Sequence, residues 1–453
     1  MFTRPIQRGA LARAVARARA GGAADPGSLA DYYLKELEQE LRDERDAPSA
    51  AERVASARAS LHLIADQEAR LRPTVTAAGA IRAHERLTWH QRVEVDRDGL
   101  GDSDFLGVEW KHGISGQFTH AYFAIDLDVV RLWLGRRNPA WGVGLDGSSL
   151  ILQGHSPSFD QVGVAGSIGP LDFTAFTAPL DAIPLPAGAG NLVAGSTTRM
   201  ADRWLGAHRI AFTIRERLRV GLTETIVYGG PDRGLDWGYA NPLLLSYAVQ
   251  WNGGRNDNPF WSLDFYFHMN EWIDAFGEFL LDDFQYEEQL EPNQIGFLAG
   301  TRIKNLPLSV PCILDLEYTR LNNLVYVHED PWNRYTYGNA ALGSPLGPDG
   351  DRARARLTAR PAYWLELVAE FDHTRKGERT ILEPQGEPGT YGGSFLAGEV
   401  SEISGGRVRL EWIPHAERRV FGEYVRVEDD WTIRGGGTIR GQKTWNALFG
   451  NGR

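Results

Sequence analysis

The chain has 453 residues, 51 of them glycine, with 11% aromatic residues, a formal net charge of −11 and one cysteine, Cys312. The negative charge argues against a nucleic-acid partner, because phosphate recognition needs a concentrated basic surface. A single cysteine excludes an intrachain disulfide and a cluster of thiolates around a metal. The length suits two or three ordinary domains or one large β architecture.

Residues 1–27 carry arginines at positions 4, 8, 13, 17 and 19 and no acidic residue before Asp25. A secretory signal peptide needs an uninterrupted apolar segment of about 7–15 residues. The arginines interrupt every candidate segment, so no signal peptide is visible. We predict that 1–27 is an unstructured or export-related segment.

Residues 28–75 contain two helix-like patterns. SLAD at 28–31 resembles a capping box and begins the first pattern, and PSAAE at 48–52 begins the second. Apolar residues follow each start at helical spacing, namely Leu34, Leu37 and Leu41 and then Val54, Leu61 and Ile64. We predict a helical hairpin over 28–75, on the periplasmic side if the remainder spans an outer membrane.

From about residue 80 the apolar residues recur with period two. Leu218, Val220 and Leu222 alternate with Arg219 and Thr223, and roughly 16–18 segments with this pattern follow one another to the C-terminus. Connections are alternately minimal, as at 215–216 and 269–270, and long and rich in Gly, Pro, Asn and Asp.

This pattern favours a barrel whose apolar face meets lipid and whose charged face lines a wet lumen, because outer-membrane barrels have short periplasmic turns and long outer loops. Closure also leaves no edge strand with unsatisfied backbone. We predict an all-β fold, a closed antiparallel transmembrane β-barrel of about 16–18 strands over residues 80–453, with a small N-terminal helical element. Glu224 falls on the apolar side, so we expect it at the rim or after a bulge.

Two motifs that elsewhere mark catalytic or cofactor sites carry little weight. GVGLDG at 142–147 has the G-x-G-x-x-G spacing of a dinucleotide site, but a short β-like run follows it instead of a helix. The histidines lack the spacing of a zinc site. We predict no catalytic residue, no metal and no cofactor.

One loop has the composition of a sugar-binding surface. PWNRYTYGN at 331–339 offers aromatic faces for stacking and amide and guanidinium groups for hydroxyls or carboxylates. Its candidate carbohydrate-binding residues are Trp332, Asn333, Arg334, Tyr335 and Tyr337. The alternatives are an interfacial aromatic girdle or simple loop packing. Asp282 and Asp283 are further candidates, for a sugar hydroxyl or a cation, unless they are a charged strand end at the rim.

Three segments resemble a known family. LGRRNPAWGVGLDGSSLILQGHSPSFDQVGV (134–164), HRIAFTIRERLRVGLTETIVYGG (208–230) with YANPLLLSY (239–247), and EFLLDDFQ (278–285) are similar, in this order, to segments of the capsule assembly Wzi family of outer-membrane barrels. The resemblance implies an 18-stranded barrel, a small periplasmic helical element, a role in attaching or organising surface polysaccharide, and no catalysis.

The leading functional interpretation is a non-enzymatic outer-membrane barrel of a Gram-negative-type bacterium that binds surface capsular or exopolysaccharide. It would contact outer-membrane lipid and lipopolysaccharide, bind no nucleic acid, and favour a monomer. One alternative is a porin or substrate-specific channel on the same fold, which an open lumen would distinguish. The other is a soluble β-rich carbohydrate-active enzyme, which solubility without detergent would distinguish.

Overall fold

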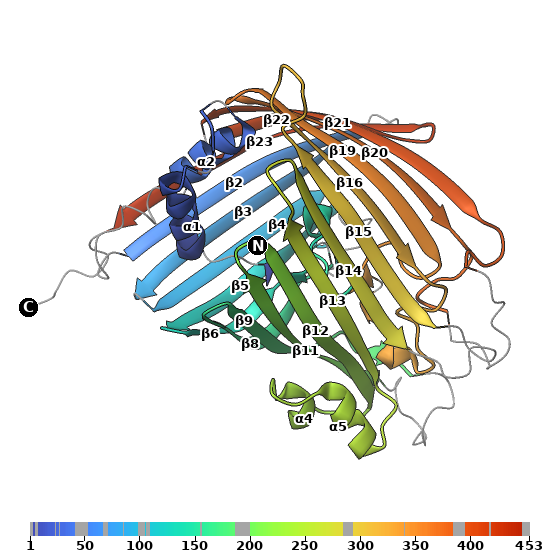
Figure 1. Cartoon of the computed structure of the whole chain (residues 1–453). Helices are drawn as coiled ribbons and strands as arrows, with labels where there is room; N and C mark the ends of the chain where they lie inside the picture. Colours follow the sequence, from blue (N-terminus) through green and yellow to red (C-terminus); the bar gives the residue numbers. More distant parts are fainter. Residues whose placement is uncertain are drawn as a thin grey trace, which may run out of the picture.

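The computed structural model describes the chain between residues 3 and 445, with gaps (Figure 1). The described residues are 3–4, 8–22, 24–26, 28–40, 53–66, 71–84, 86–97, 105, 109–154, 156–185, 200–283, 293–338, 340–383, 395–415 and 418–445.

Eighteen antiparallel strands of the described ranges form a closed ring, because β2 pairs with both β3 and β23. They are β2 Arg53–Asp66, β3 Leu71–His84, β4 Leu87–Arg97, β5 Ile114–Leu127, β6 Val130–Arg137, β8 Phe159–Ile168, β9 Leu171–Pro179, β11 Met200–Ile214, β12 Leu218–Pro231, β13 Asn258–His268, β14 Ile273–Asp283, β15 Gln294–Lys304, β16 Cys312–Leu321, β19 Gly350–Ala362, β20 Leu365–Lys376, β21 Ser401–His415, β22 Arg418–Val427 and β23 Asp430–Trp445. The predicted closed barrel is confirmed.

Short elements accompany the ring. β10 (Ile183–Pro184) extends the sheet beside β11, β1 (Thr3–Arg4) pairs with β7 (Ala140–Trp141), and β17 (Thr336–Tyr337) pairs with β18 (Ala340–Ala341). The helices are α1 Arg8–Ala20, α2 Leu29–Glu40, α4 Trp237–Ala240 and α5 Ser246–Gly253, with 3₁₀ turns η2 Leu145–Gly147 and η3 Pro331–Asn333. No helix in the described ranges is long and apolar enough to cross a membrane.

The two ends of the barrel differ in the length of their connections. At the short-turn end, residues 128–129, 215–217 and 363–364 join neighbouring strands. Arg215 and Glu216 both have positive φ, at 49° and 56°, which is typical of a tight hairpin turn between twisted strands. At the long-loop end the connections include 138–158, 232–257 and 322–349.

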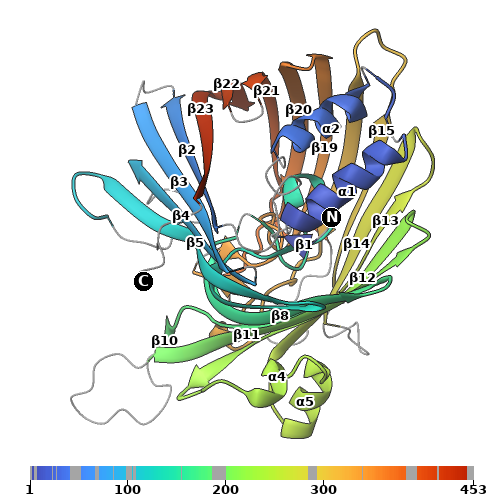
Figure 2. The ribbon, with the colours of Figure 1, turned by 90° about the vertical axis from the view of Figure 1, so that its left-hand side faces the viewer.

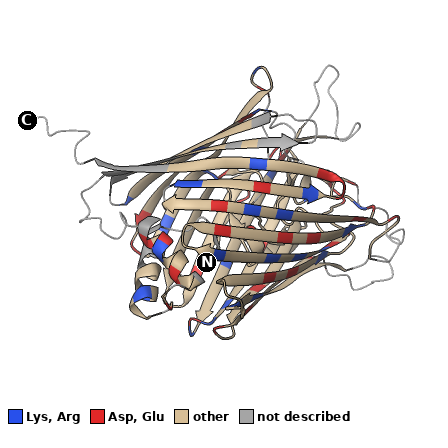
Figure 3. Ribbon diagram, turned by 90° about the horizontal axis from the view of Figure 1, so that it is seen from above, with Lys and Arg blue, Asp and Glu red and all other residues tan. Residues whose placement is uncertain are grey.

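Side chains alternate between the two faces of the wall as predicted. Leu218, Val220 and Leu222 pair in register with Phe267, Phe265 and Leu263, whose side chains are exposed on the outer face. Arg219 points inward, where its guanidinium contacts the Asp172 carboxylate at 2.7 Å. Figure 3 shows the same alternation of charged and uncharged positions along many strands. The same alternation predicts that Arg217 also faces inward, but this residue lies in the exposed turn before β12.

The barrel begins earlier than predicted. Residues 53–66 and 71–84 form β2 and β3, so the second predicted helix is wrong where it is described, and its proposed start at 48–52 lies outside the described residues. The segment after Arg53 also alternates with period two, and β2 pairs along its length with strands on both sides. Pairing on both sides outweighs the helix preference of its alanines, since strand preference is set mainly by context.

The helical hairpin is α1 with α2, so it lies within 8–40 and not across 28–75. Of the two alternatives predicted for 1–27, an unstructured segment is therefore wrong for residues 8–20, and an export-related role stays a prediction. Leu11 and Val15 of α1 pack against Leu34 and Leu37 of α2, and Arg19 contacts Asp31 at 2.8 Å.

The hairpin lies at the short-turn end, as predicted for the helical element. Glu36 of α2 pairs with Arg360 at 2.5 Å and with Arg419, and Tyr33 donates to Glu366 at 2.9 Å. These wall residues lie on inward-facing positions next to short connections. Figure 2 shows both helices at the mouth of the ring, in front of β19.

Candidate functional site

Two long connections, 138–158 and 322–349, fold back into the barrel and pack on each other; we call them the plug loops. The Tyr335 hydroxyl donates to the Ile151 carbonyl at 2.7 Å, and the Tyr326 hydroxyl donates to the Leu150 carbonyl. The side chains of Leu150, Ile151, Tyr326 and Tyr335 are all fully buried. The plug loops therefore form a core inside the lumen.

Apolar side chains of one part of the wall complete this core. Trp141 packs edge-on against Phe176 of β9 with ring centroids 5.3 Å apart, and Phe260 of β13 lies 4.1 Å from Tyr335. Inward-facing residues of β5–β16 add to the same cluster, among them Trp133, Phe159, Leu205, Val227, Phe276, Leu280 and Leu298. The interior of this half of the barrel resembles a globular core and not an aqueous channel.

Carboxylates of the strands hold the backbone of the first plug loop. Glu278 of β14 accepts from the Ile151 amide at 3.2 Å and from the Ser149 hydroxyl at 3.0 Å. Glu317 of β16 accepts from the Leu145 amide at 2.7 Å. Buried amides of an irregular loop need such partners, because leaving one unsatisfied costs about 1–3 kcal/mol.

The glycines of GVGLDG have a structural explanation. A Cβ on Gly144 would lie 2.2 Å from the Ser148 hydroxyl oxygen, and one on Gly142 would lie 2.5 Å from the Ser149 Cβ. Asp146 and Gly147 have φ of 58° and 80°. The motif thus builds a compact turn inside the lumen, which agrees with its rejection as a dinucleotide site.

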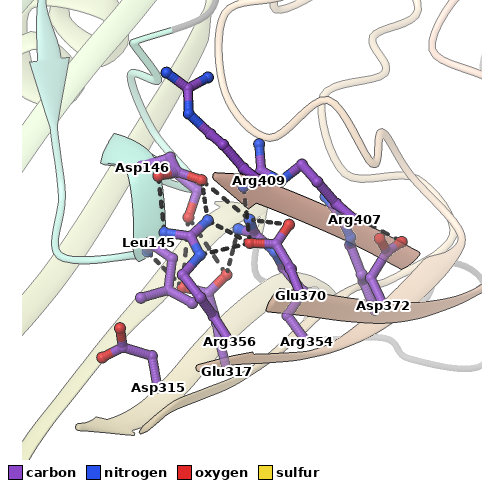
Figure 4. Close-up of polar contacts among 12 residues, drawn as sticks. Leu145, Asp146, Asp315, Glu317, Arg354, Arg356, Glu370, Asp372, Arg407 and Arg409 are labelled. Carbon is purple, nitrogen blue, oxygen red and sulfur yellow. Dashed lines mark hydrogen bonds and ion pairs between the residues drawn. The ribbon is translucent and has the colours of Figure 1, made fainter. Parts of the chain in front are cut away.

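Asp146 projects from this turn into a cluster of charged side chains on β16 and β19–β21 (Figure 4). It contacts Arg356 at 2.9 Å and Arg354 at 3.2 Å. Glu370 lies on the other side of these arginines, 3.2 Å from Arg354, and also contacts Arg407 at 3.1 Å. Acidic and basic groups therefore alternate across neighbouring strands, and the loop supplies one further acid.

Burial alone would raise the pKa of Asp146, but its hydrogen bonds and ion pairs with Arg356 and Arg354 outweigh that effect. The pKa of this carboxyl is therefore held below its usual range. Two cavities flank the turn. One of about 330 Å³ is lined by Asp146, Glu317 and Arg352, and one of about 320 Å³ is lined by Tyr266, Arg302 and Arg356.

The predicted sugar-binding segment lies in the second plug loop, and the structure divides its residues. Tyr335 is fully buried, and Asn333 is 1% exposed and donates to the Asn256 carbonyl at 2.6 Å. Neither side chain is accessible in this conformation. Trp332, Arg334 and Tyr337 are partly exposed, so the carbohydrate-binding prediction depends on these three.

Arg334 differs from Arg203 and Arg209, two buried arginines of the lumen. Its guanidinium has no hydrogen bond or ion pair among the described residues, and its buried Nε is unsatisfied. Burial lowers the pKa of Arg334. Arg203 and Arg209, by contrast, are buried with partners: Arg203 pairs with Asp181 at 3.0 Å, and Arg209 donates to Asp264 at 2.9 Å.

The two predicted aspartates, at the end of β14, differ in burial. Asp282 points into the lumen, is 4% exposed and accepts from the Tyr326 amide at 2.6 Å, so it anchors the second plug loop. Asp283 is exposed, and a bulge between Leu281 and Asp283 pairs it with the buried Gln294 of β15. The Asp282 carboxylate is therefore committed to the loop backbone, and of the two only Asp283 is accessible to a ligand. Among the described residues, no group of three or more potential ligands could hold a metal ion.

Sequence reasoning missed the charged cluster and the role of Asp146. The arginines at 352, 354 and 356 alternate with alanines, and this signal for one charged face was readable in the sequence. Nothing local indicated that an acid about two hundred residues earlier would join them.

Comparisons with known proteins agree with this architecture. The family model for capsule assembly protein Wzi matches residues 48–431. A solved Escherichia coli structure, described as Wzi, an outer membrane protein involved in group 1 capsule assembly and a carbohydrate-binding β-barrel, is 14% identical. The match covers 97% of this chain and 93% of that one, with a TM-score of 0.66. Pseudomonas aeruginosa OprD matches at 9% identity, over 88% and 96% of the two chains, with a TM-score of 0.48. No curated protein matches the sequence.

Proposed function

We propose that this chain, which belongs to the capsule assembly Wzi family, is a non-enzymatic outer-membrane barrel that binds or organises surface polysaccharide at its long-loop end. The family description supports a role in capsule assembly. The ionic groups of the charged cluster are paired with one another, which suits a structural role better than a catalytic one.

The barrel's exterior supports a place in the outer membrane. Rows of exposed apolar side chains cover the wall, including Phe123, Leu134, Leu222 and Leu263. Such rows suit lipid and argue against the alternative of a soluble enzyme. Long loops then lie outside the cell and α1–α2 in the periplasm. Lipid and lipopolysaccharide are the expected neighbours of a monomeric barrel.

The filled lumen favours binding over diffusion. The plug loops, with Trp141 and Tyr335 in their core, occupy the interior, and α1–α2 stand at the opposite mouth. The porin alternative requires these elements to move. Planar-bilayer conductance tests it: steady ion-conducting steps from the wild-type protein would favour the channel.

Arg334 is the observation that carries the binding proposal. This partly buried guanidinium at the long-loop end has no hydrogen bond or ion pair within the described ranges, and a uronate carboxylate or sugar hydroxyls can satisfy its donors. The partly exposed rings of Trp332 and Tyr337 lie in the same segment and supply apolar faces for a sugar ring.

The test is retention of polysaccharide, extracted from the source bacterium's surface, by purified protein in detergent. Arg334→Gln removes one charged hydrogen-bonding group, usually worth about 1.5–3 kcal/mol, so binding should weaken at least about tenfold. Trp332→Ala should weaken binding independently, through the loss of stacking. Arg215→Gln, in the exposed turn at the opposite end, is the matched control.

The heat-modifiable form on gels verifies that each barrel is folded. If folded Arg334→Gln and Trp332→Ala both bind as tightly as the control, this segment is not the glycan site. If the wild-type protein retains no polysaccharide, the proposed function itself is wrong.

A further inference from the structure

Helices α4 and α5, in the 232–257 connection, lie outside the barrel. Figures 1 and 2 both show them beyond the wall, next to β11 and β12 at the long-loop end. The plug loops enter the lumen, whereas this connection folds over the outer surface.

Outward-facing side chains hold α4 and α5 against the wall. Ile226 and Tyr228 of β12 are fully buried under Tyr239, whose ring centroid is 4.7 Å from that of Tyr228. Trp204 and Val249 pack on the same cluster. The connection is therefore a folded element with its own small core.

The same element explains the acid on the apolar face. β12 keeps its register through Glu224 without a bulge, so this side chain points outward, yet it is 4% exposed. It accepts from the first backbone amides of α5, at Ser246 (2.8 Å) and Tyr247 (3.1 Å), and it contacts His208 at 2.7 Å. Glu224 fixes α5 onto the wall at the rim.

The exposed surface of this element is strongly apolar. We call its six exposed residues the outer patch: Trp237 (79% exposed), Leu243 (90%), Leu244 (44%), Leu245 (65%), Tyr247 (43%) and Trp251 (67%). Four charged groups of the connection form two ion pairs, Arg255 with Asp236 and Arg233 with Asp257. Hydrophobic exposure on this scale marks a surface that is covered in the working protein.

The outer patch is continuous with the lipid-facing wall. The Tyr247 ring lies 5.9 Å from that of Trp251 and 5.1 Å from that of Trp261, which is on β13. Trp261 begins an outward row that continues through Leu263 and Phe265 toward the short-turn end. Aromatic residues at the upper end of an apolar row are typical of the membrane–water interface.

We propose that the outer patch inserts into the outer leaflet of the membrane and contacts lipid acyl chains. Leucines 243–245 enter the acyl region, while Trp237, Tyr247 and Trp251 occupy the head-group boundary. The element thereby holds the barrel's long-loop end at the membrane surface beside β11–β13. This inference rests on the proposed membrane location and is independent of glycan binding.

The test places a fluorophore at Leu243→Cys in the full chain, reconstituted in vesicles of phosphatidylcholine and lipid A with brominated acyl chains. An insertion depth of about 5–10 Å brings the probe within contact of bromine, so quenching should be at least about twofold stronger than at a water-exposed site. Trp251→Cys provides a second position. Asp429→Cys is the matched control, since that side chain lies fully exposed at the tip of the β22–β23 connection.

The native Cys312 is 2% exposed and should react little with the fluorophore. The wild-type chain, treated with the same label, measures the remaining fluorescence from Cys312. Equal quenching at 243, 251 and 429 in a heat-modifiable, folded barrel would overturn the proposal. A second outcome would also overturn the proposal: bromine does not quench the probes at 243 and 251, and their exposure to water falls as the protein-to-lipid ratio rises. That outcome would indicate contact between two copies of the chain. Polysaccharide retention by the same preparations separates this outcome from failure of the proposed function.

Discussion

The two halves of the inner wall hold the first plug loop by different physical means. On β5–β14 the loop packs its apolar residues into a core, with Trp141 against Phe176 and Leu150–Leu152 fully buried. On β16 and β19–β21 the same loop presents Asp146 to arginines that already have acidic partners. The first contact depends on close apolar packing that excludes water, and the second depends on ion pairs.

The two kinds of contact should respond differently to salt and to mutation. Burial of a large ring is nearly independent of salt, whereas ion pairs near water are screened and individually weak. The apolar half should therefore determine whether the loop is docked, and the charged half should determine where its turn lies. The amide exchange of residues 140–152 by mass spectrometry measures both.

The largest effect is expected from Trp141→Ala. The ring is 1% exposed, and replacing a buried aromatic by alanine costs about 3–5 kcal/mol. Exchange of the loop amides should accelerate by about a hundredfold or more. Trp412→Ala, on the exposed outer face of β21, is the control and should leave the loop unchanged. Slow exchange in Trp141→Ala would mean that the apolar half is not the main anchor.

A smaller effect is expected from Asp146→Asn. The variant keeps the shape of the side chain and removes its charge, while Arg354 and Arg356 retain Glu370. Because the Asp146 side chain is 44% exposed, the charged hydrogen bonds are worth only about 1–1.5 kcal/mol. Exchange at Leu145–Ser148 should rise roughly tenfold. Asp128→Asn is the control: this side chain is 84% exposed in a turn, and the variant should leave the exchange at Leu145–Ser148 unchanged. A hundredfold rise would reverse the ranking of the two halves.

The smallest expected effect is a pH-dependent loss of docking of the second plug loop. Burial lowers the pKa of His328 to about 4, and its neutral Nδ1 accepts from the Asp330 amide at 3.0 Å. A histidine with a lowered folded pKa stabilises the docked loop fully above its ordinary value of 6.5, and this contribution declines as pH falls from 6.5 toward 4.

From about pH 7.5 to about pH 6, the opened fraction of 322–338 should rise about fourfold, once the intrinsic pH dependence of exchange is divided out. The charged anchor should not respond in this range, because the pKa of Asp146 lies below its usual value. His328→Gln is the control that should abolish the rise. The same fourfold rise in that variant would assign the effect to another group.

Several features followed from local sequence pattern. Alternation predicted the closed barrel and the direction of Leu222 and Arg219, because a lipid-facing strand has period two. The same alternation places Arg352, Arg354 and Arg356 on one face of their strand, although we made no prediction for them from the sequence. It failed at 53–66, because an alanine-rich strand carries little contrast between its faces and its apolar residues also fit a helical spacing.

The candidate site was less predictable, because composition does not reveal what covers a side chain. Trp332, Asn333, Arg334, Tyr335 and Tyr337 are all aromatic or polar residues of one loop, and the sequence does not rank them by exposure. Only packing separates the buried Tyr335 and Asn333 from Arg334, whose side chain has no partner in the part of the chain that the structure describes. Asp282 and Asp283 are adjacent in sequence, yet Asp282 is buried under the Tyr326 amide and Asp283 is exposed.

The chain's periodicity is enough to specify a lipid-facing and a lumen-facing side for each strand, since that choice depends only on neighbours two residues apart. The partners of the charged and aromatic side chains are decided by contacts between distant segments. Glu224 is tolerated on the outer face because the amides of α5, about twenty residues later, fold over it. Asp146 meets Arg356 because a long loop turns inward instead of outward. Both outcomes depend on satisfying buried polar groups in three dimensions, which no local pattern encodes.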